Sequence, residues 1–183
     1  HLTAEPAGKA AVLPLLTELP ARYPAGGKGE MRFRFAENIK REGFGSASRV
    51  NYVARIGNFR TGGFRYTGAL RIAQTMLSYG YLWNEIRSKG GAYGCAVRFG
   101  RGGSVVFSSY RDPKLEETDK VYEGVPGYLE QYEADEREMT KAIIGAVGEM
   151  DTPRTPQLSG LLALSAYYSK VTDEMFARER AEV

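Results

Sequence analysis

Residues 67–110 read TGALRIAQTM LSYGYLWNEI RSKGGAYGCA VRFGRGGSVV FSSY, and the spacing of the apolar residues changes within this stretch. Between Thr67 and Arg87 these residues recur near helical spacing, which predicts an amphipathic helix. From Tyr93 to Phe99 apolar residues alternate with small or polar ones, which predicts a strand. Gly100–Gly103 has the composition of a turn, so residues 105–110 are expected to return as the second strand of a hairpin.

The predicted helix ends at Gly90-Gly91, because glycine readily adopts the left-handed conformation that stops a helix. Its apolar stripe is formed by Ala69, Ile72, Ala73, Met76, Leu77, Trp83 and Ile86. The other predicted elements are a helix over 11–19, strands over 31–35 and 50–56, and helices over 115–132, 139–150, 158–168 and from 172 onward. We expect a kink near Pro126 and, because residues 158–168 are apolar nearly all round, burial of that helix.

The hairpin, followed by a run of helices, predicts an α+β fold with a mixed or antiparallel sheet and helices packed on one face. A chain of 183 residues with 43% apolar residues can bury one sizeable core, so residues 1–183 are interpreted as a single domain. The chain lacks an initiator Met and ends within a predicted helix. We therefore expect a piece of a longer protein, truncated at its ends.

Composition excludes several classes of site within this chain. The only His is His1, so no metal centre built on two or three imidazoles can form, and a Ser-His-Asp triad would have to use the terminal residue. The single Cys95 excludes a disulfide framework and a Cys-x-x-Cys redox pair. We expect this chain to hold no metal and no cofactor of its own.

The charge pattern points away from nucleic acid and membranes as partners. The formal net charge is only +3, and the basic residues are interleaved with glutamates. No run approaches the roughly 20 apolar residues that cross a bilayer. The glycine-rich stretches at 26–29 and 57–63 lack the residues of a phosphate-binding loop.

One stretch combines chemistry with a tight chain reversal. Arg87 falls in the last turn of the predicted helix, Gly90-Gly91 reverses the chain, and Tyr93 opens the next strand. A guanidinium and a phenol could therefore converge on one point, where they would suit a carbonyl that becomes an oxyanion. The alternative is purely structural: Arg87 would cap helix carbonyls and Tyr93 would pack on the sheet.

The run Trp83–Gly94, ending in RSKGGAYG, resembles the C-terminal substrate-binding motif of presequence proteases, which belong to the pitrilysin and insulin-degrading-enzyme class of zinc metallopeptidases. Three further segments resemble the same subfamily in the same order, namely Val50–Ala54, Phe107–Pro113 and Ala142–Gly145. The resemblance covers roughly residue 43 to the end.

The resemblance implies a domain of the mitochondrial processing peptidase type in an enzyme of four related α+β domains. The two halves of such an enzyme close around unfolded peptides. Zinc and a general-base Glu lie on an inverted His-x-x-Glu-His helix in the first domain, while the second half supplies an Arg and a Tyr. Arg87 and Tyr93 match these two positions, which implies binding of the substrate backbone and stabilisation of the tetrahedral intermediate. Gly90 and Gly91 match the chain reversal and receive a geometric role only.

This chain has no His-x-x-Glu-His motif, so the resemblance implies that the zinc ligands lie outside it. The expected partners are peptide substrates and the N-terminal catalytic half of the same polypeptide, and the chain alone should be inactive. The expected location is the bacterial cytoplasm or an organelle matrix. Two alternatives stay open: a non-catalytic scaffold or subunit of the same fold that works by protein–protein contact, and a free-standing α+β binding module. A truncated domain should also expose a sheet edge and tend to self-associate.

Overall fold

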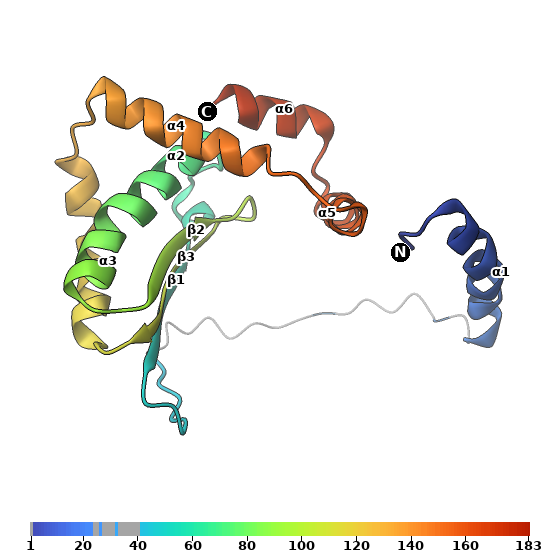
Figure 1. The fold of residues 1–183 in the computed structure, drawn as a ribbon, viewed down its shortest axis with the longest axis horizontal. Helices are drawn as coiled ribbons and strands as arrows, with labels where there is room; N and C mark the ends of the chain where they lie inside the picture. The colour runs from blue at the N-terminus through green and yellow to red at the C-terminus, as the bar shows by residue number, and fades with distance from the viewer. Residues whose placement is uncertain (1, 24–25, 27–31, 33–40) are drawn as a thin grey trace. The chain divides into compact units, whose positions relative to one another are not determined.

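The computed structural model describes residues 2–23, 26, 32 and 41–183 (Figure 1). The chain divides into two compact units, one comprising His1–Ser46 and Pro153–Lys170, the other Ala47–Thr152 and Val171–Val183. Nearly all of the strand predicted over 31–35 lies outside the described residues. The pocket described below lies in the second unit.

The second unit is built on a small antiparallel sheet of β1 (Asn51–Asn58), β2 (Gly94–Phe99) and β3 (Ser104–Asp112). The strand order is β1-β3-β2, so β3 pairs with both neighbours. The hairpin of β2 and β3 and the strand predicted over 50–56 are confirmed. Within the described residues no further strand pairs with β1 or β2.

The helix predicted to end at Arg87 is present but is wound in two ways. A short 3₁₀ helix, η1 (Phe59–Gly62), comes before it in the chain. The predicted helix then begins as the α-helix α2 (Ala69–Met76) and continues as the π-helix η2 (Leu77–Lys89). In a π-helix the backbone bonds join residues five apart, so each turn holds more residues than an α-helical turn.

The π winding changes which side chains face the sheet. Leu77, Leu82 and Ile86 are buried at spacings of five and four residues, and they form the inner face of η2. The predicted stripe, counted at α-helical spacing, omitted Leu82 and included Trp83. Trp83 instead lies on the outer side and is 40% exposed. Four residues later on the same helix, Arg87 lies against the Trp83 ring.

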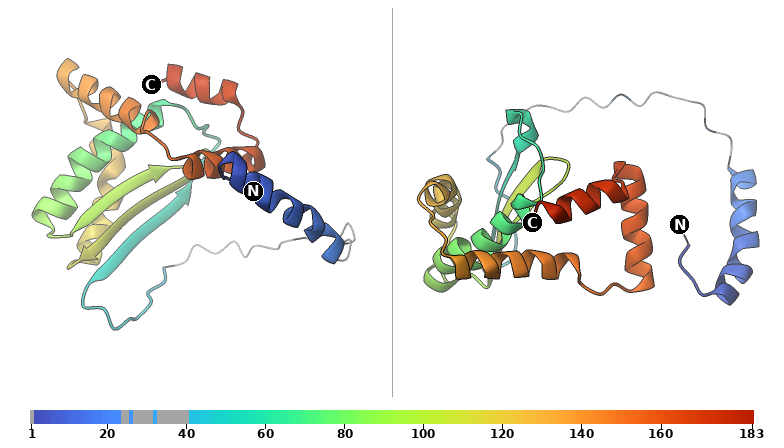
Figure 2. Two further views of the ribbon diagram at one scale, coloured as in Figure 1. Left: turned by 45° about the vertical axis from the view of Figure 1, so that its right-hand side comes forward. Right: turned by 90° about the horizontal axis from the view of Figure 1, so that it is seen from above.

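The remaining helices of this unit are α3 (Glu116–Glu130), α4 (Glu136–Met150) and α6 (Asp173–Ala181). Helices η2 and α3 pack on the sheet and on each other, while α4 packs on α2 (Figure 2). Helix α3 continues through Pro126 and buries Tyr122 and Val125. The predicted α+β class, with helices on one face of a sheet, is confirmed.

The other unit contains α1 (Pro6–Arg22) and α5 (Pro156–Ser169). The expectation that residues 158–168 are buried is wrong, because every residue of α5 is exposed or half-buried. An apolar sequence cannot bury itself within one helix, since all its side chains point away from the axis and need a second surface.

No described helix is long and apolar enough to cross a membrane.

Strand alternation divides the sheet into a covered face and an open face. Val53, Val97 and Ser109 point to the helices and are buried, whereas Tyr52 and Ile56 point away and are exposed. The core under the helices consists of Val53, Leu77, Leu82, Ile86, Ala92, Val97, Tyr122 and Val125. This asymmetry leaves one side of the sheet accessible in the described part of the chain.

A fully buried carboxylate, Asp112, joins the end of β3 to the start of α3. It accepts hydrogen bonds from Ser109 Oγ at 2.6 Å, Thr118 Oγ1 at 2.8 Å and the Lys114 backbone N–H at 2.9 Å. A buried carboxylate is costly unless such donors surround it. The chain around Asp112 is therefore held in one conformation.

A second buried carboxylate, Glu179, ties α6 to the rest of the unit. It forms ion pairs with Arg71 of α2 and Arg101 of the β2–β3 turn, and it accepts a hydrogen bond from Tyr66 Oη at 2.9 Å. Burial raises the pKa of Glu179, but the hydrogen bonds from these three donors outweigh it, so that its pKa lies below the ordinary value.

We predict that Glu179→Gln lowers the free energy of unfolding by about 3 kcal/mol at neutral pH, because two guanidinium groups would lose their buried counterion. A lowered pKa in the folded state means that the ion pairs contribute fully above the ordinary pKa of Glu. That contribution to stability is lost as the pH falls through the pKa that Glu179 has in the folded state. Urea unfolding measured from neutral to acidic pH should therefore show a shallower acid loss of stability in the variant than in the wild type.

The matched control is Glu133→Gln, which changes an exposed carboxylate in the loop between α3 and α4. It should leave both the stability at neutral pH and the acid slope unchanged. Equal effects of the two substitutions would contradict the role of Glu179.

Candidate functional site

Arg87 owes its position to the way η2 ends. The backbone N–H of Gly91 donates to the Arg87 carbonyl at 3.0 Å, and that of Ala92 donates to the Ile86 carbonyl at 3.1 Å. Gly91 has φ = 85°, a left-handed conformation that glycine adopts without steric cost. The carbonyls of Ile86 and Arg87 are thus satisfied by backbone donors, and the Arg87 side chain lies against the Trp83 ring.

Tyr93 immediately precedes β2 and is held against the end of β3. Its backbone N–H donates to the carbonyl of Arg111 at 3.4 Å. Its ring meets the ring of Tyr110 edge-on, with centroids 5.2 Å apart, while 56% of the residue remains exposed. Tyr93 therefore combines a fixed backbone with an accessible phenol.

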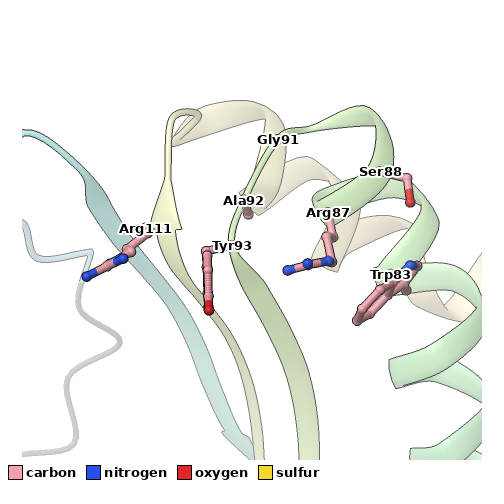
Figure 3. Close-up of a pocket in the computed structure, with 7 residues that line it drawn as sticks. All are labelled: Trp83, Arg87, Ser88, Gly91, Ala92, Tyr93 and Arg111. Carbon is pink, nitrogen blue, oxygen red and sulfur yellow. The ribbon is translucent and has the colours of Figure 1, made fainter.

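The side chains of these elements line an open pocket of about 610 Å³. Figure 3 shows Tyr93 between Arg87 on the helix side and Arg111 on the strand side. The guanidinium carbon of each arginine lies 5.5 Å from the centre of the Tyr93 ring, and that of Arg87 lies 4.5 Å from the centre of the Trp83 ring. The pocket is lined by Trp83, Arg87, Ser88, Gly91, Ala92, Tyr93 and Arg111.

The aromatic pair beside the pocket depends on the absence of a side chain at Gly94. A Cβ atom built on Gly94 would lie 2.3 Å from Cε1 of Tyr110, closer than any real contact. Gly94 is paired directly with Tyr110 across the β2–β3 ladder. The Tyr110 ring therefore occupies the space that any other residue at position 94 would need.

The structure brings together the two residues that the sequence analysis selected, and it adds two more. Arg87 and Tyr93 share the pocket, and the guanidinium of Arg87 stacks on an indole rather than capping helix carbonyls. Trp83 and Arg111 were not expected at the site: α-helical counting put Trp83 in the apolar stripe, and the strand predicted over 105–110 ended before Arg111. A signal for Arg111 was present, since it lies in the quoted segment Phe107–Pro113.

The chemistry of the pocket is cationic and hydrogen-bond donating. Two guanidinium groups and one phenol face it, and none of its lining residues is acidic. Such a set suits an oxygen that carries or develops negative charge. The neighbouring Cys95 is half-buried, and its burial raises the pKa of the thiol, so this cysteine packs as a small apolar residue.

The described residues do not include a set of ligands for a zinc ion. In the ranges described, no group of three or more His, Cys, Asp or Glu side chains could hold a metal.

The comparison with known proteins identifies the family. Residues 41–183 match the PreP C-terminal domain. The chain belongs to this family. All residues of the pocket, and all the strands of the sheet, fall within the matched part.

Several curated proteins are similar to this chain. Protein HypA of Clostridium perfringens is 43% identical over 151 residues, which cover 82% of this chain and 16% of that protein. Presequence protease 1, chloroplastic/mitochondrial, of Arabidopsis thaliana is 34% identical over 79% of this chain and 14% of its own length. The mitochondrial presequence protease of Danio rerio is 32% identical over 69% of this chain and 12% of its own length. This PreP C-terminal domain thus spans between 12% and 16% of these three relatives.

We predict that Arg87→Ala increases the exposure of Trp83, because the guanidinium that covers the indole is removed. The chain has a single Trp, so its intrinsic fluorescence reports this pocket directly. The emission maximum should shift to longer wavelength and quenching by acrylamide should increase. The stability loss should be small, about 0.5–1 kcal/mol, as for an exposed cation–π contact.

Lys89→Ala is the matched control, since Lys89 is in the same helical turn but pairs with Glu85. It should leave the Trp83 emission unchanged. An unchanged emission in Arg87→Ala would mean that the two side chains are not stacked in solution.

Proposed function

We propose that residues 1–183 form the C-terminal substrate-binding domain of a longer zinc-dependent metallopeptidase that degrades unfolded peptides. Arg87 and Tyr93 then bind the substrate backbone and stabilise the oxyanion of the tetrahedral intermediate. The observation that carries this proposal is their meeting in one cationic, solvent-open pocket within a chain of the PreP C-terminal domain family.

The geometry supports a role in binding a carbonyl rather than in bond cleavage itself. A guanidinium and a phenol both donate hydrogen bonds, and no lining residue could act as a general base at neutral pH. As a peptide carbonyl becomes tetrahedral, its oxygen gains negative charge, and prepositioned donors stabilise that state more than the ground state.

The openness of the pocket supports a partner surface that covers it. Tyr93 is 56% exposed and Arg87 is only half-buried, so water reaches both donors in the described part of the chain. Hydrogen bonds to an oxyanion stabilise it far more where water is excluded. In this proposal the N-terminal half of the same polypeptide provides both the cover and the zinc, whose ligands lie outside this chain.

The proposed substrate class and location follow the relatives. Their names describe presequence proteases of mitochondria and chloroplasts, together with a bacterial protein named HypA. Peptides without stable structure present their backbone carbonyls to such a pocket. The corresponding location is an organelle matrix or the bacterial cytoplasm.

We predict that, in the full-length protein, Arg87→Ala and Tyr93→Phe each lower kcat/KM for an unstructured peptide by about 10²-fold or more, the effect of losing one oxyanion donor. The measurement is steady-state cleavage of a fluorogenic peptide, with zinc content determined on the same preparations. Zinc content should not change, because neither residue is a ligand in this proposal.

Two exposed residues of the same unit provide matched controls. Tyr79→Phe removes a phenol from η2, and Arg98→Ala removes a guanidinium from β2, both outside the pocket. Both variants should retain wild-type kcat/KM. If Arg87→Ala and Tyr93→Phe do so too, the assigned roles are wrong, and a full-length protein without zinc or turnover would favour the scaffold instead.

A further inference from the structure

The end of β3 departs from regular pairing at Arg111. Tyr110 is opposite Tyr52 in β1, but the next pair is Asp112 with Asn51, so β1 has no partner for Arg111. Arg111 is therefore the extra residue of a β-bulge. Bulges redirect side chains and are frequent beside active sites.

The backbone of Arg111 is in a conformation that arginine rarely adopts. Its φ is 49°, in the left-handed region, which is occupied by glycine in the G1 type of bulge. In the described chain only Lys170 is another non-glycine residue with positive φ. A side chain at such a position carries a steric cost that glycine would avoid, so its retention needs a compensating role.

The bulge has a direct effect on which way the side chains point. Ser109 and Asp112 are both buried although they are three residues apart, a spacing that regular alternation does not allow. If the alternation of β3 continued regularly past Ser109, Arg111 would point under the sheet and Asp112 would point out. With the bulge, Asp112 makes its buried hydrogen bonds and Arg111 reaches the rim of the pocket (Figure 3).

At the rim, Arg111 holds Tyr93 in two ways. Its carbonyl accepts the backbone N–H of Tyr93, and its guanidinium lies 5.5 Å from the centre of the Tyr93 ring. Arg87 lies at the same distance from the ring, and Tyr110 meets it edge-on. The phenol is thus confined by three side chains, of which Arg111 is the one contributed through the bulge.

We propose that Arg111 is a positioning residue for Tyr93, presented by the bulge so that the phenol stays aimed into the pocket next to Arg87. This inference rests on the proposed role of Tyr93 as a hydrogen-bond donor to the substrate. Arg111 acts through the Tyr93 hydroxyl, whose hydrogen bond is strongest to the oxyanion, so its removal lowers kcat more than it weakens substrate binding.

The test uses the full-length protein with the fluorogenic peptide, and two variants that both suit a left-handed backbone. Arg111→Asn and Arg111→Gly keep the bulge but remove the guanidinium. We expect kcat to fall about tenfold in both, with KM within about twofold of the wild type and the melting temperature retained. Arg111→Lys, which keeps a cation near the ring, should recover part of the loss.

Lys170→Gly is the backbone control, because it changes the other left-handed residue (φ = 58°), at the C-terminal end of α5. It should leave kcat unchanged. The double variant Arg111→Asn/Tyr93→Phe is the decisive measurement. If Arg111 acts through the hydroxyl, this variant is no slower than Tyr93→Phe alone.

Wild-type kcat in Arg111→Asn overturns the inference, and so does a double variant whose losses multiply, since Arg111 would then act by a contact of its own. These outcomes differ from failure of the proposed function. In that case Tyr93→Phe alone has wild-type kcat, and Arg111 has no hydroxyl to position.

Discussion

The burial of one carboxylate constrains the whole site. Asp112 is completely buried and must keep its three donors, from Ser109, Lys114 and Thr118, because an unsatisfied buried charge would cost several kcal/mol. Ser109 lies in β3, Lys114 in the connection and Thr118 in the first turn of α3. The hydrogen bonds to Asp112 therefore fix these three parts of the chain together. The bulge at Arg111 is the backbone adjustment that this burial requires.

The local elements were largely predictable, because their signals lie within short stretches. Alternation around Val97 and the glycines at 100–103 predict the hairpin, and Gly90-Gly91 predicts the helix end next to Arg87. The π winding of η2 was not predictable from the sequence, since it shows only in which side chains of the helix contact the sheet. Leu82 is buried there in place of Trp83 because each turn holds more residues than α-helical counting assumes.

The site shows the same division between local and long-range causes. Arg87 and Tyr93 are six positions apart along a helix end and a reversal, so their meeting could be inferred from sequence order alone. Arg111 approaches Tyr93 only through strand pairing, and its orientation depends on a register shift against Asn51 and Tyr52. The exposure of α5 was equally unpredictable from local sequence. Its apolar residues favour burial, but they do not indicate which other element would cover them.

The contact between Gly94 and Tyr110 has an evolutionary consequence. The two residues are paired across the ladder, and a Cβ at position 94 would overlap the tyrosine ring. Position 94 therefore cannot gain a side chain while the Tyr110 ring keeps its place. Among homologous domains, a residue larger than glycine at the first position should occur together with a smaller side chain at the second, so that the two sites covary as one steric unit.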